Sequence, residues 1–280
     1  YNASMSKTLT KSGLTIPLIG LGTWGLRGRK CRKVVRKSLE LGYRHIDTAA
    51  MYENESEVGS GIVDSGVDRK EVFLTTKINT IEVNNEGIVD AFHKSLSDLK
   101  TDYVDLLLIH WPAFSTNLGD MLEIMYGIKE SKKARAIGVS NFNTTLLNEC
   151  TRLGFEDIYC NQVEYHPFLS QEILLRKMNE IGVIPVAYCP LCRGDVAKDS
   201  VIIELSEKYN KTPSQVTLRW IIQQNAVVIP KSAKKRRLKE NIDIYDFEID
   251  NQDMDRIHGL ARGQRLVPNL DTKPLLGAWD

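Results

Sequence analysis

Short apolar runs alternate with longer amphipathic segments along most of the chain. The apolar runs, rich in β-branched residues, predict strands near 17–22, 43–47, 72–76, 104–109, 135–139, 159–163, 184–188 and 226–230. The amphipathic segments predict helices near 29–41, 55–64, 85–99, 119–133, 144–153, 170–182, 199–224 and 234–240. Within the third of these, Ile88, Phe92 and Leu96 recur at helical spacing. The alternation predicts a parallel sheet covered by helices, an α/β fold.

Two architectures satisfy this pattern, a closed (β/α)8 TIM barrel and an open doubly wound sheet. In a barrel, functional residues follow many different strands, whereas in an open sheet they gather at one switch point. Polar candidates follow the second to the eighth predicted strand, namely Asp47, Lys77, His110, Ser140, Asn141, Gln162, Tyr188, Lys231 and Ser232. This spread favours the barrel as a single domain over residues 7–280. Residues 1–6 are expected to be an expression-tag remnant or a disordered N-terminus, because four residues precede Met5.

One motif favours the open sheet. Residues 20–25 read Gly-Leu-Gly-Thr-Trp-Gly, a dinucleotide-binding pattern with Asp47 about twenty residues on. However, Trp24 is bulky for a turn that approaches a pyrophosphate, and residues 27–30 delay the next helix. An open-sheet NAD dehydrogenase also leaves the later polar residues unexplained, so we prefer the barrel.

Composition and charge narrow the function classes. The chain has 280 residues and a formal net charge of +1, so no overall field recruits nucleic acid or a membrane surface. No apolar stretch reaches the length of a membrane span, and no signal-peptide pattern opens the sequence. Five cysteines predict reduced thiols and a cytoplasmic location. Cys189 and Cys192 form one CxxC, which without two further ligands predicts no metal site. We expect a monomer.

Four of the polar residues can together build a proton donor. A lysine lowers the pKa of a neighbouring phenol, so Lys77 is expected to activate Tyr52. Asp47 is expected to keep Lys77 charged and oriented. His110 is expected to donate a hydrogen bond to a substrate carbonyl oxygen and to form an oxyanion pocket with Tyr52.

These residues lie in motifs that resemble the aldo-keto reductase superfamily. The motifs are HIDTAAMYENESE at 45–57, Thr-Lys at 76–77 and His-Trp-Pro at 110–112. The likeness extends over roughly 14–275, and the tail RLVPNLDTKPLLGAWD is most similar to the bacterial 2,5-diketogluconate reductase B branch. The resemblance implies a barrel enzyme that reduces a carbonyl with a nicotinamide cofactor and draws the proton from Tyr52.

The expected cofactor is NADPH. Ser140, Asn141 and Gln162 suit a nicotinamide carboxamide, and Tyr188 suits stacking on the ring. The run PKSAKKRRLKEN at 230–241 could be a solvated helix face or an RNA contact, but its start at a strand end favours a phosphate. We therefore predict that Lys231, Ser232 and Arg237 bind the 2′-phosphate that distinguishes NADPH from NADH. The resemblance adds Thr23, Trp24, Asp47, Leu191, Glu240 and Asn241 as cofactor contacts.

The substrate is expected to be small. Trp24 and Trp111, with Tyr52 and His110, are expected to line its pocket. Glu53 and Glu55 are expected to be solvated or helix-capping groups. The loop 113–118 is short, which predicts a shallow pocket, and the tail 264–280 with Trp279 is expected to form a further wall.

Small aldehydes, dicarbonyls and keto-sugar acids all fit this pocket. The alternative is a non-catalytic cofactor-binding or structural protein on the same fold. The presence of all four proton-donor residues argues against that alternative.

Overall fold

The strands close into a barrel. The computed structural model describes residues 7–79, 85–112 and 117–267. Eight strands pair in parallel and in chain order: β3 (Leu21–Gly22), β4 (His45–Asp47), β5 (Phe73–Ile78), β6 (Val104–Ile109), β7 (Ala134–Ser140), β8 (Cys160–Glu164), β9 (Ile184–Tyr188) and β10 (Val227–Val228). The two ends of this sheet meet, because Gly20 N–H donates to Val228 O at 2.8 Å and Val228 N–H donates to Leu18 O at 2.9 Å. The predicted TIM barrel is therefore confirmed.

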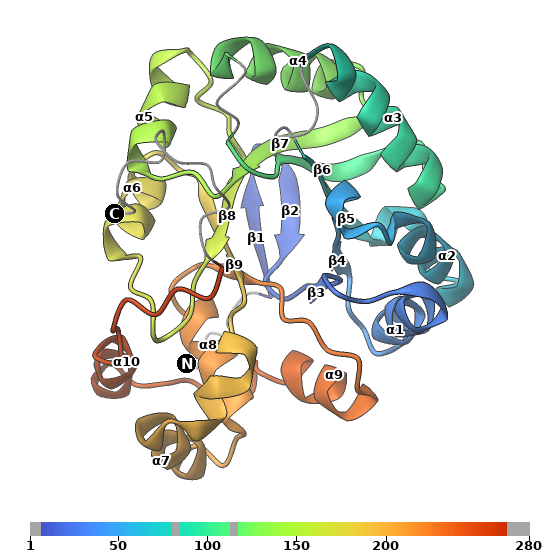
Figure 1. Cartoon of the computed structure of the whole chain (residues 1–280). Coiled ribbons are helices and arrows are strands. Elements are labelled where there is room, and N and C mark those ends of the chain that lie inside the picture. Colours follow the sequence, from blue (N-terminus) through green and yellow to red (C-terminus); the bar gives the residue numbers. More distant parts are fainter. Residues whose placement is uncertain (1–6, 80–84, 113–116, 268–280) are drawn as a thin grey trace.

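Helices surround the barrel (Figure 1). They are α1 (Gly28–Glu40), α2 (Glu55–Ser65), α3 (Ile88–Leu99), α4 (Leu118–Glu130), α5 (Thr144–Arg152), α6 (Glu172–Glu180), α7 (Ser200–Lys208), α8 (Pro213–Ile222) and α9 (Lys235–Ile242). Helical cover on the outside and side-chain filling on the inside leave each strand buried, so strands such as β6 are apolar almost throughout. In the described parts of the connections there are four short 3₁₀ segments, η1 (Ala50–Tyr52), η2 (Arg69–Glu71), η3 (Asn85–Gly87) and η4 (Cys192–Lys198).

The single helix predicted over 199–224 is wrong, because two helices occupy that stretch. α7 ends at Lys208, and α8 begins after Thr212. The Thr212 hydroxyl accepts from Gln215 N–H, and the Gln215 side chain accepts from Thr212 N–H. This capping box, followed by Pro213, satisfies the free amides at the start of a new helix. The cap at Thr212 therefore separates two helices.

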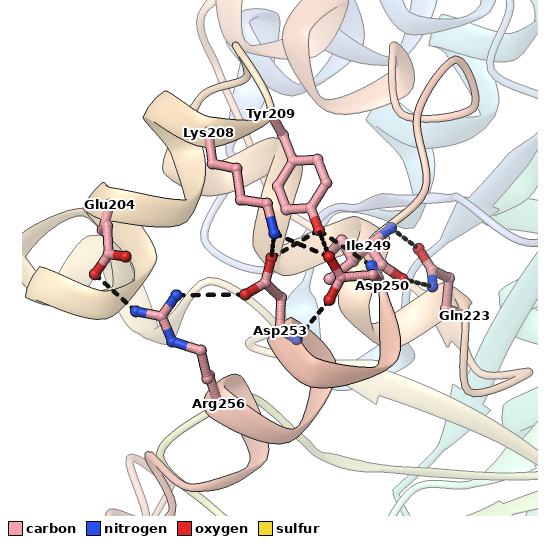
Figure 2. Close-up of polar contacts among 8 residues, drawn as sticks. All are labelled: Glu204, Lys208, Tyr209, Gln223, Ile249, Asp250, Asp253 and Arg256. Atoms are coloured by element: carbon pink, nitrogen blue, oxygen red, sulfur yellow. Dashed lines mark hydrogen bonds and ion pairs between the residues drawn. The ribbon is translucent and has the colours of Figure 1, made fainter.

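Among the described residues, one hairpin and one helix lie outside the repeated strand–helix pattern and were not predicted. A hairpin of β1 (Thr8–Lys11) and β2 (Leu14–Pro17) crosses the amino end of the barrel, where Tyr159 OH donates to Leu14 O at 2.9 Å. The second is α10 (Asn251–His258), which packs on α7 through the polar cluster in Figure 2. There Lys208 Nζ lies 2.5 Å from Asp253 and 2.9 Å from Asp250. Across 7–79, 85–112 and 117–267, every helix is too short or too polar to cross a membrane.

Candidate active site

Lys77 lies at the centre of a polar cluster at the carboxyl end of the barrel. Its side chain is fully buried in β5. The Nζ atom donates to Asp47 Oδ1 at 2.6 Å, to the Thr48 carbonyl at 2.8 Å and to the Tyr52 hydroxyl at 3.3 Å. Parallel pairing of β4 with β5 brings Asp47 alongside. An ammonium has three N–H donors, and all three are used here, so its orientation is fixed.

The charges of this cluster oppose the cost of burial. Burial acts to lower the pKa of Lys77, but the Asp47 carboxylate and the Tyr52 hydroxyl outweigh it and raise that pKa. Burial raises the pKa of Tyr52, and the Lys77 ammonium acts in the opposite direction without reversing the shift. The expectation that Lys77 gives Tyr52 a lowered pKa therefore needs correction, because burial outweighs the Lys77 charge. Tyr52 keeps its proton, and Lys77 limits the cost of losing it.

His110 faces Tyr52 from the end of the next strand. The two rings meet edge to face, with centroids 5.6 Å apart and an interplanar angle of 76°. Burial, and then the Lys77 charge, lower the pKa of His110 well below its usual value. The imidazole is therefore neutral near pH 7, and it can donate a hydrogen bond without carrying a charge.

The amides expected near the nicotinamide extend the same network. Gln162 Nε2 donates to Asp47 Oδ2 at 2.7 Å, and Ser140 Oγ donates to Gln162 O at 2.8 Å. The Asn141 amide nitrogen donates to His110 O at 3.0 Å, and its oxygen accepts from Tyr188 OH at 2.8 Å. The structure thus brings these predicted residues together with the four catalytic candidates in one connected polar cluster.

The tryptophans differ in exposure. Trp24 is 59% exposed, and it precedes α1 at the rim. Trp111 is 4% exposed and follows His110. Thr23 is buried beside the cluster, where its hydroxyl donates to Asp47 O at 2.9 Å. Leu191 is half-buried at the start of η4.

The basic run follows β10 and forms α9, away from Lys77. Lys231 and Arg237 are exposed, whereas Ser232 and Asn241 are buried. Ser232 Oγ accepts from Lys234 N–H at 3.2 Å, which orders the turn before the helix. Glu240, expected at the adenine end of the cofactor, accepts a hydrogen bond from Thr212 Oγ1 at 2.8 Å.

The glycines of the GxGxxG pattern have a packing role. A Cβ atom at Gly22 would lie 2.6 Å from Ile229 O, and one at Gly20 would lie 2.6 Å from the His45 ring. Real Cβ atoms do not approach so closely, so these glycines allow the strands to meet where the barrel closes. The open-sheet interpretation of this motif is therefore wrong.

Three residues of the site were missed or misjudged. The Thr48 carbonyl binds Lys77, and Asn54 Nδ2 braces the loop before α1 by donating to Thr23 O and Leu26 O, both at 3.0 Å. Glu55 is buried and accepts a hydrogen bond from Thr76 Oγ1, so its expected solvation is wrong. Burial raises the pKa of Glu55. Glu53 is exposed, as expected.

Glu164 holds the start of the C-terminal segment at the rim. Its carboxylate accepts from Leu266 N–H at 2.6 Å, from Val267 N–H at 3.0 Å and from His166 Nε2 at 2.9 Å. Burial acts to raise the pKa of Glu164, but these bonds outweigh it and lower that pKa. The remainder of the predicted wall, including Trp279, lies outside the described residues, as do loop residues 113–116.

The cysteines are free thiols. Cys192 is buried and lies 3.3 Å from Gln264 Nε2. Cys189 and Cys192 both have positive φ, of 51° and 47°, in the loop after β9. That left-handed backbone is one that glycine adopts most readily, so both cysteines occupy unusual positions. The described parts of the chain contain no group of three or more metal-ligating side chains.

A closed barrel with polar side chains gathered at the carboxyl ends of its strands is the arrangement of a TIM-barrel enzyme. A model of the aldo/keto reductase family matches residues 18–262, and the chain belongs to this family. It is 41% identical over 261 residues to a glyoxal reductase of Bacillus subtilis strain 168, covering 93% of this chain and 94% of that one.

Solved structures agree with this assignment. A putative 2,5-diketo-D-gluconic acid reductase B superposes with a TM-score of 0.93 and 38% identity, covering 99% of this chain and 98% of the other. MGS-M4, an aldo-keto reductase from a Medee basin deep-sea metagenome library, gives a TM-score of 0.90 and 35% identity, covering 95% and 98%. The chain is thus similar to oxidoreductases along nearly all of its length.

Proposed function

We propose that this protein reduces a small aldehyde, dicarbonyl or keto-sugar-acid carbonyl to the alcohol with NADPH. The observation that carries the proposal is the set of three hydrogen bonds from Lys77 Nζ to Asp47, Thr48 and Tyr52. A purely structural role does not need a fully buried ammonium held against a phenol at the rim of a barrel, because burying a charge is costly. A proton donor needs that arrangement.

Each side chain has a distinct task in this proposal. Tyr52 donates its proton to the carbonyl oxygen, and Lys77 stabilises the phenolate that remains. Asp47 keeps Lys77 protonated. Neutral His110 donates a hydrogen bond to the same oxygen, so that His110 and Tyr52 stabilise the negative charge that develops there.

The residues at the rim suit NADPH. When bound, NADPH supplies the hydride, which no side chain can provide. Lys231 and Arg237 are exposed, and within the described parts of the chain neither forms an ion pair with a carboxylate, so both are free for a phosphate. Ser140, Asn141 and Gln162 lie beside the catalytic cluster and would hold the carboxamide group of the nicotinamide. Tyr188 would stack on the nicotinamide ring. Thr23, Trp24, Leu191, Glu240 and Asn241 complete the proposed contacts.

The proposed substrate class rests on the pocket and on the relatives. Trp24 and Trp111 flank Tyr52 and His110 as proposed walls. Two relatives are named for small polar carbonyl compounds, glyoxal and a diketo sugar acid. Another, from Trypanosoma cruzi and 38% identical, is named a 9,11-endoperoxide prostaglandin H2 reductase. Because these names differ widely, we propose only a class of substrate, small carbonyl compounds, of which dicarbonyls are the first to test.

The test combines cofactor titration with turnover. NADPH and NADH are titrated by fluorescence, and methylglyoxal is then added to the same sample. We expect tight NADPH binding, weak NADH binding and oxidation of NADPH by the carbonyl. NADPH binding without turnover on a wider carbonyl panel would favour a non-catalytic protein, and no NADPH binding would contradict the proposal.

Tyr52→Phe tests the proton donor. We expect a roughly 10²- to 10⁴-fold loss of turnover, the usual contribution of a general acid, with little change in NADPH affinity. Tyr126→Phe is the matched control, because the Tyr126 hydroxyl is buried without a hydrogen-bond partner among the described residues. A parallel loss of NADPH binding in Tyr52→Phe would show instead that Tyr52 is structural.

The proposal extends to the state of the protein in the cell. Five free cysteines suit a reducing cytoplasm. We propose a monomer, since the whole catalytic cluster comes from one chain. Sedimentation of the purified protein at micromolar concentration tests this, and a stable dimer would contradict it.

A further inference from the structure

Helices α1 and α9 present an unusual concentration of unpaired positive charge. The two helices lie side by side (Figure 1). A groove of about 560 Å³ between them is lined by three apolar residues, Val34, Ala233 and Leu238, and by six cations, Arg29, Lys30, Lys33, Arg36, Lys37 and Lys235. The whole chain has a net charge of only +1, so this surface is a local feature against a nearly neutral background.

The ion pairs divide the cations of α1 into two groups. Arg36 and Lys37, in the later turns, both pair with Glu40, at 3.3 Å and 2.7 Å, and Arg32 pairs with Asp64 at 2.5 Å. Arg29, Lys30 and Lys33, in the first turns, are exposed, and within the described residues no carboxylate lies within ion-pair distance of them. The same holds for the cations of α9 from Lys235 to Lys239.

This placement opposes helix stability. Neither helix has an acidic residue in its first turn. Positive side chains near a helix N-terminus interact unfavourably with the helix dipole, and like charges four residues apart, such as Arg29 and Lys33, repel each other. A role in stability therefore does not explain the free cations.

Their position suggests another role. α1 follows β3 and α9 follows β10, so both helices begin at the carboxyl rim of the barrel, the end that carries Lys77 and Tyr52. The unpaired cations of α1 are thus on the turns nearest to the proposed phosphate site of α9, whereas the neutralised ones are farther along the helix. An exposed, flexible cation that lacks a fixed partner acts through its field rather than by fixed geometry.

We propose that Arg29, Lys30 and Lys33 of α1 form a capture surface, which attracts NADPH to the rim before Lys231 and Arg237 bind its phosphate. The proposal rests on the use of NADPH proposed above. It assigns to α1 a part in cofactor preference through the association rate. NADPH carries one more phosphate than NADH, so the capture surface should increase the association rate of NADPH more than that of NADH.

Stopped-flow measurement of cofactor binding tests this directly. The variant is Arg29→Gln/Lys30→Gln/Lys33→Gln, because glutamine keeps helix propensity and removes only charge. We expect its association rate constant for NADPH to fall roughly three- to tenfold at about 10 mM ionic strength, where the Debye length is about 30 Å. The dissociation rate constant should stay within twofold, and the rate for NADH should fall less.

The matched control is Lys132→Gln/Lys133→Gln/Lys177→Gln, which makes the same change in net charge after α4 and on α6, away from the groove. Within the described residues these three lysines also have no carboxylate within ion-pair distance. Its association rate constant should stay near that of the wild type. The salt dependence of the unmutated protein is a second measurement, and its slope should be steeper for NADPH than for NADH.

Two results would overturn the capture surface. One is an equal association rate in both triple variants at low salt, and the other is a decrease that persists unchanged at about 300 mM salt, where charges are screened. In either case NADPH still binds, and the proposed function stands. If the unmutated protein does not bind NADPH, both proposals fail.

Discussion

Lys77 is the residue on which the proposed catalytic cluster depends, because it is a buried cation with three fixed hydrogen bonds. Lys77→Met would leave the Asp47 carboxylate buried, with the Gln162 amide as its one remaining hydrogen-bond partner among the described residues. Removing one member of a buried ion pair typically costs about 3–5 kcal/mol. We expect the free energy of unfolding in urea to fall by that amount and turnover to be lost.

The double variant Asp47→Asn/Lys77→Met separates stability from chemistry. It removes both charges, so we expect it to recover about 1–3 kcal/mol of the stability lost in Lys77→Met, but none of the turnover. Stability that falls equally in the single and double variants would mean that the ion pair is not the source of the loss.

Arg237 carries the expected choice between the two cofactors. Arg237→Ala should weaken NADPH binding by about 10- to 100-fold, the range of a charge-assisted pair with phosphate, and NADH binding by less than about threefold. Arg236→Ala, one residue earlier on the same exposed helix, is the control and should have a small effect on both. If Arg237→Ala weakens the binding of NADPH and NADH equally, Arg237 does not bind the 2′-phosphate.

Single residues differ in how far the sequence could reveal them. Asp47, Lys77 and His110 could be picked out from the sequence, because each is a reactive residue type at the end of an apolar strand. Tyr52 lies in η1, shortly after the strand that ends at Asp47. Thr48 acts through its backbone carbonyl, and because every residue has one, the sequence could not single Thr48 out. Glu55 and Asn54 are buried by contacts with distant segments. Their polar side chains therefore suggested solvent exposure for Glu55, which is wrong, and gave no reason to expect a role for Asn54.

At the scale of elements, Thr212 joins two helices. Its hydroxyl accepts from Gln215 N–H to cap α8 and donates to Glu240 of α9. Thr212→Ala should lower the free energy of unfolding by about 1–2 kcal/mol, because it removes a cap and deprives Glu240 of a donor. Thr212→Ser keeps the hydroxyl and should recover most of this loss. If Ser and Ala are equally destabilising, the methyl group and not the hydroxyl matters.

Most strands and helices of the barrel were predictable from the sequence pattern, because strands such as β6 are almost wholly apolar and helices such as α3 have one apolar face. The β1–β2 hairpin was not, since its turn at Ser12 and Gly13 is a weak signal and its strands have four residues each. α10 follows the eighth strand–helix unit, so the repeating pattern gave no reason to expect it. Polar contacts to Lys208 fix it on α7, and such contacts cannot be read from one segment alone.

At the scale of the whole molecule, a buried histidine makes stability depend on pH. Burial lowers the pKa of His45, inside the barrel, to about 4. The unfolded chain takes up a proton near pH 6.5, and the folded protein does so only near pH 4. The unfolded state therefore binds more protons in this window, so stability falls as the pH falls through it.

Urea unfolding at pH 7.5 and at pH 5 measures this effect. From these pKa values we expect His45 to contribute a loss of roughly 2 kcal/mol at pH 5, and His110, with its lowered pKa, to act in the same direction. His45→Gln should lose less stability between the two pH values than the wild type. His93→Gln, with an exposed side chain on α3, should behave like the wild type. If His45→Gln has the same pH dependence as the wild type, another group is responsible for the loss of stability at acid pH.

The bonds that Glu164 receives from Leu266 and Val267 have a consequence for protein engineering. Because a carboxylate of the barrel depends on these two backbone amides, residues up to 267 belong to the scaffold, although they follow α10. Chimaeras that exchange C-terminal segments between relatives should therefore be joined after Val267. If the junction lies before Leu266, the grafted segment must supply the two amides that bind Glu164. The stability of the barrel would then differ from one hybrid to the next, and their substrate selectivities could not be compared.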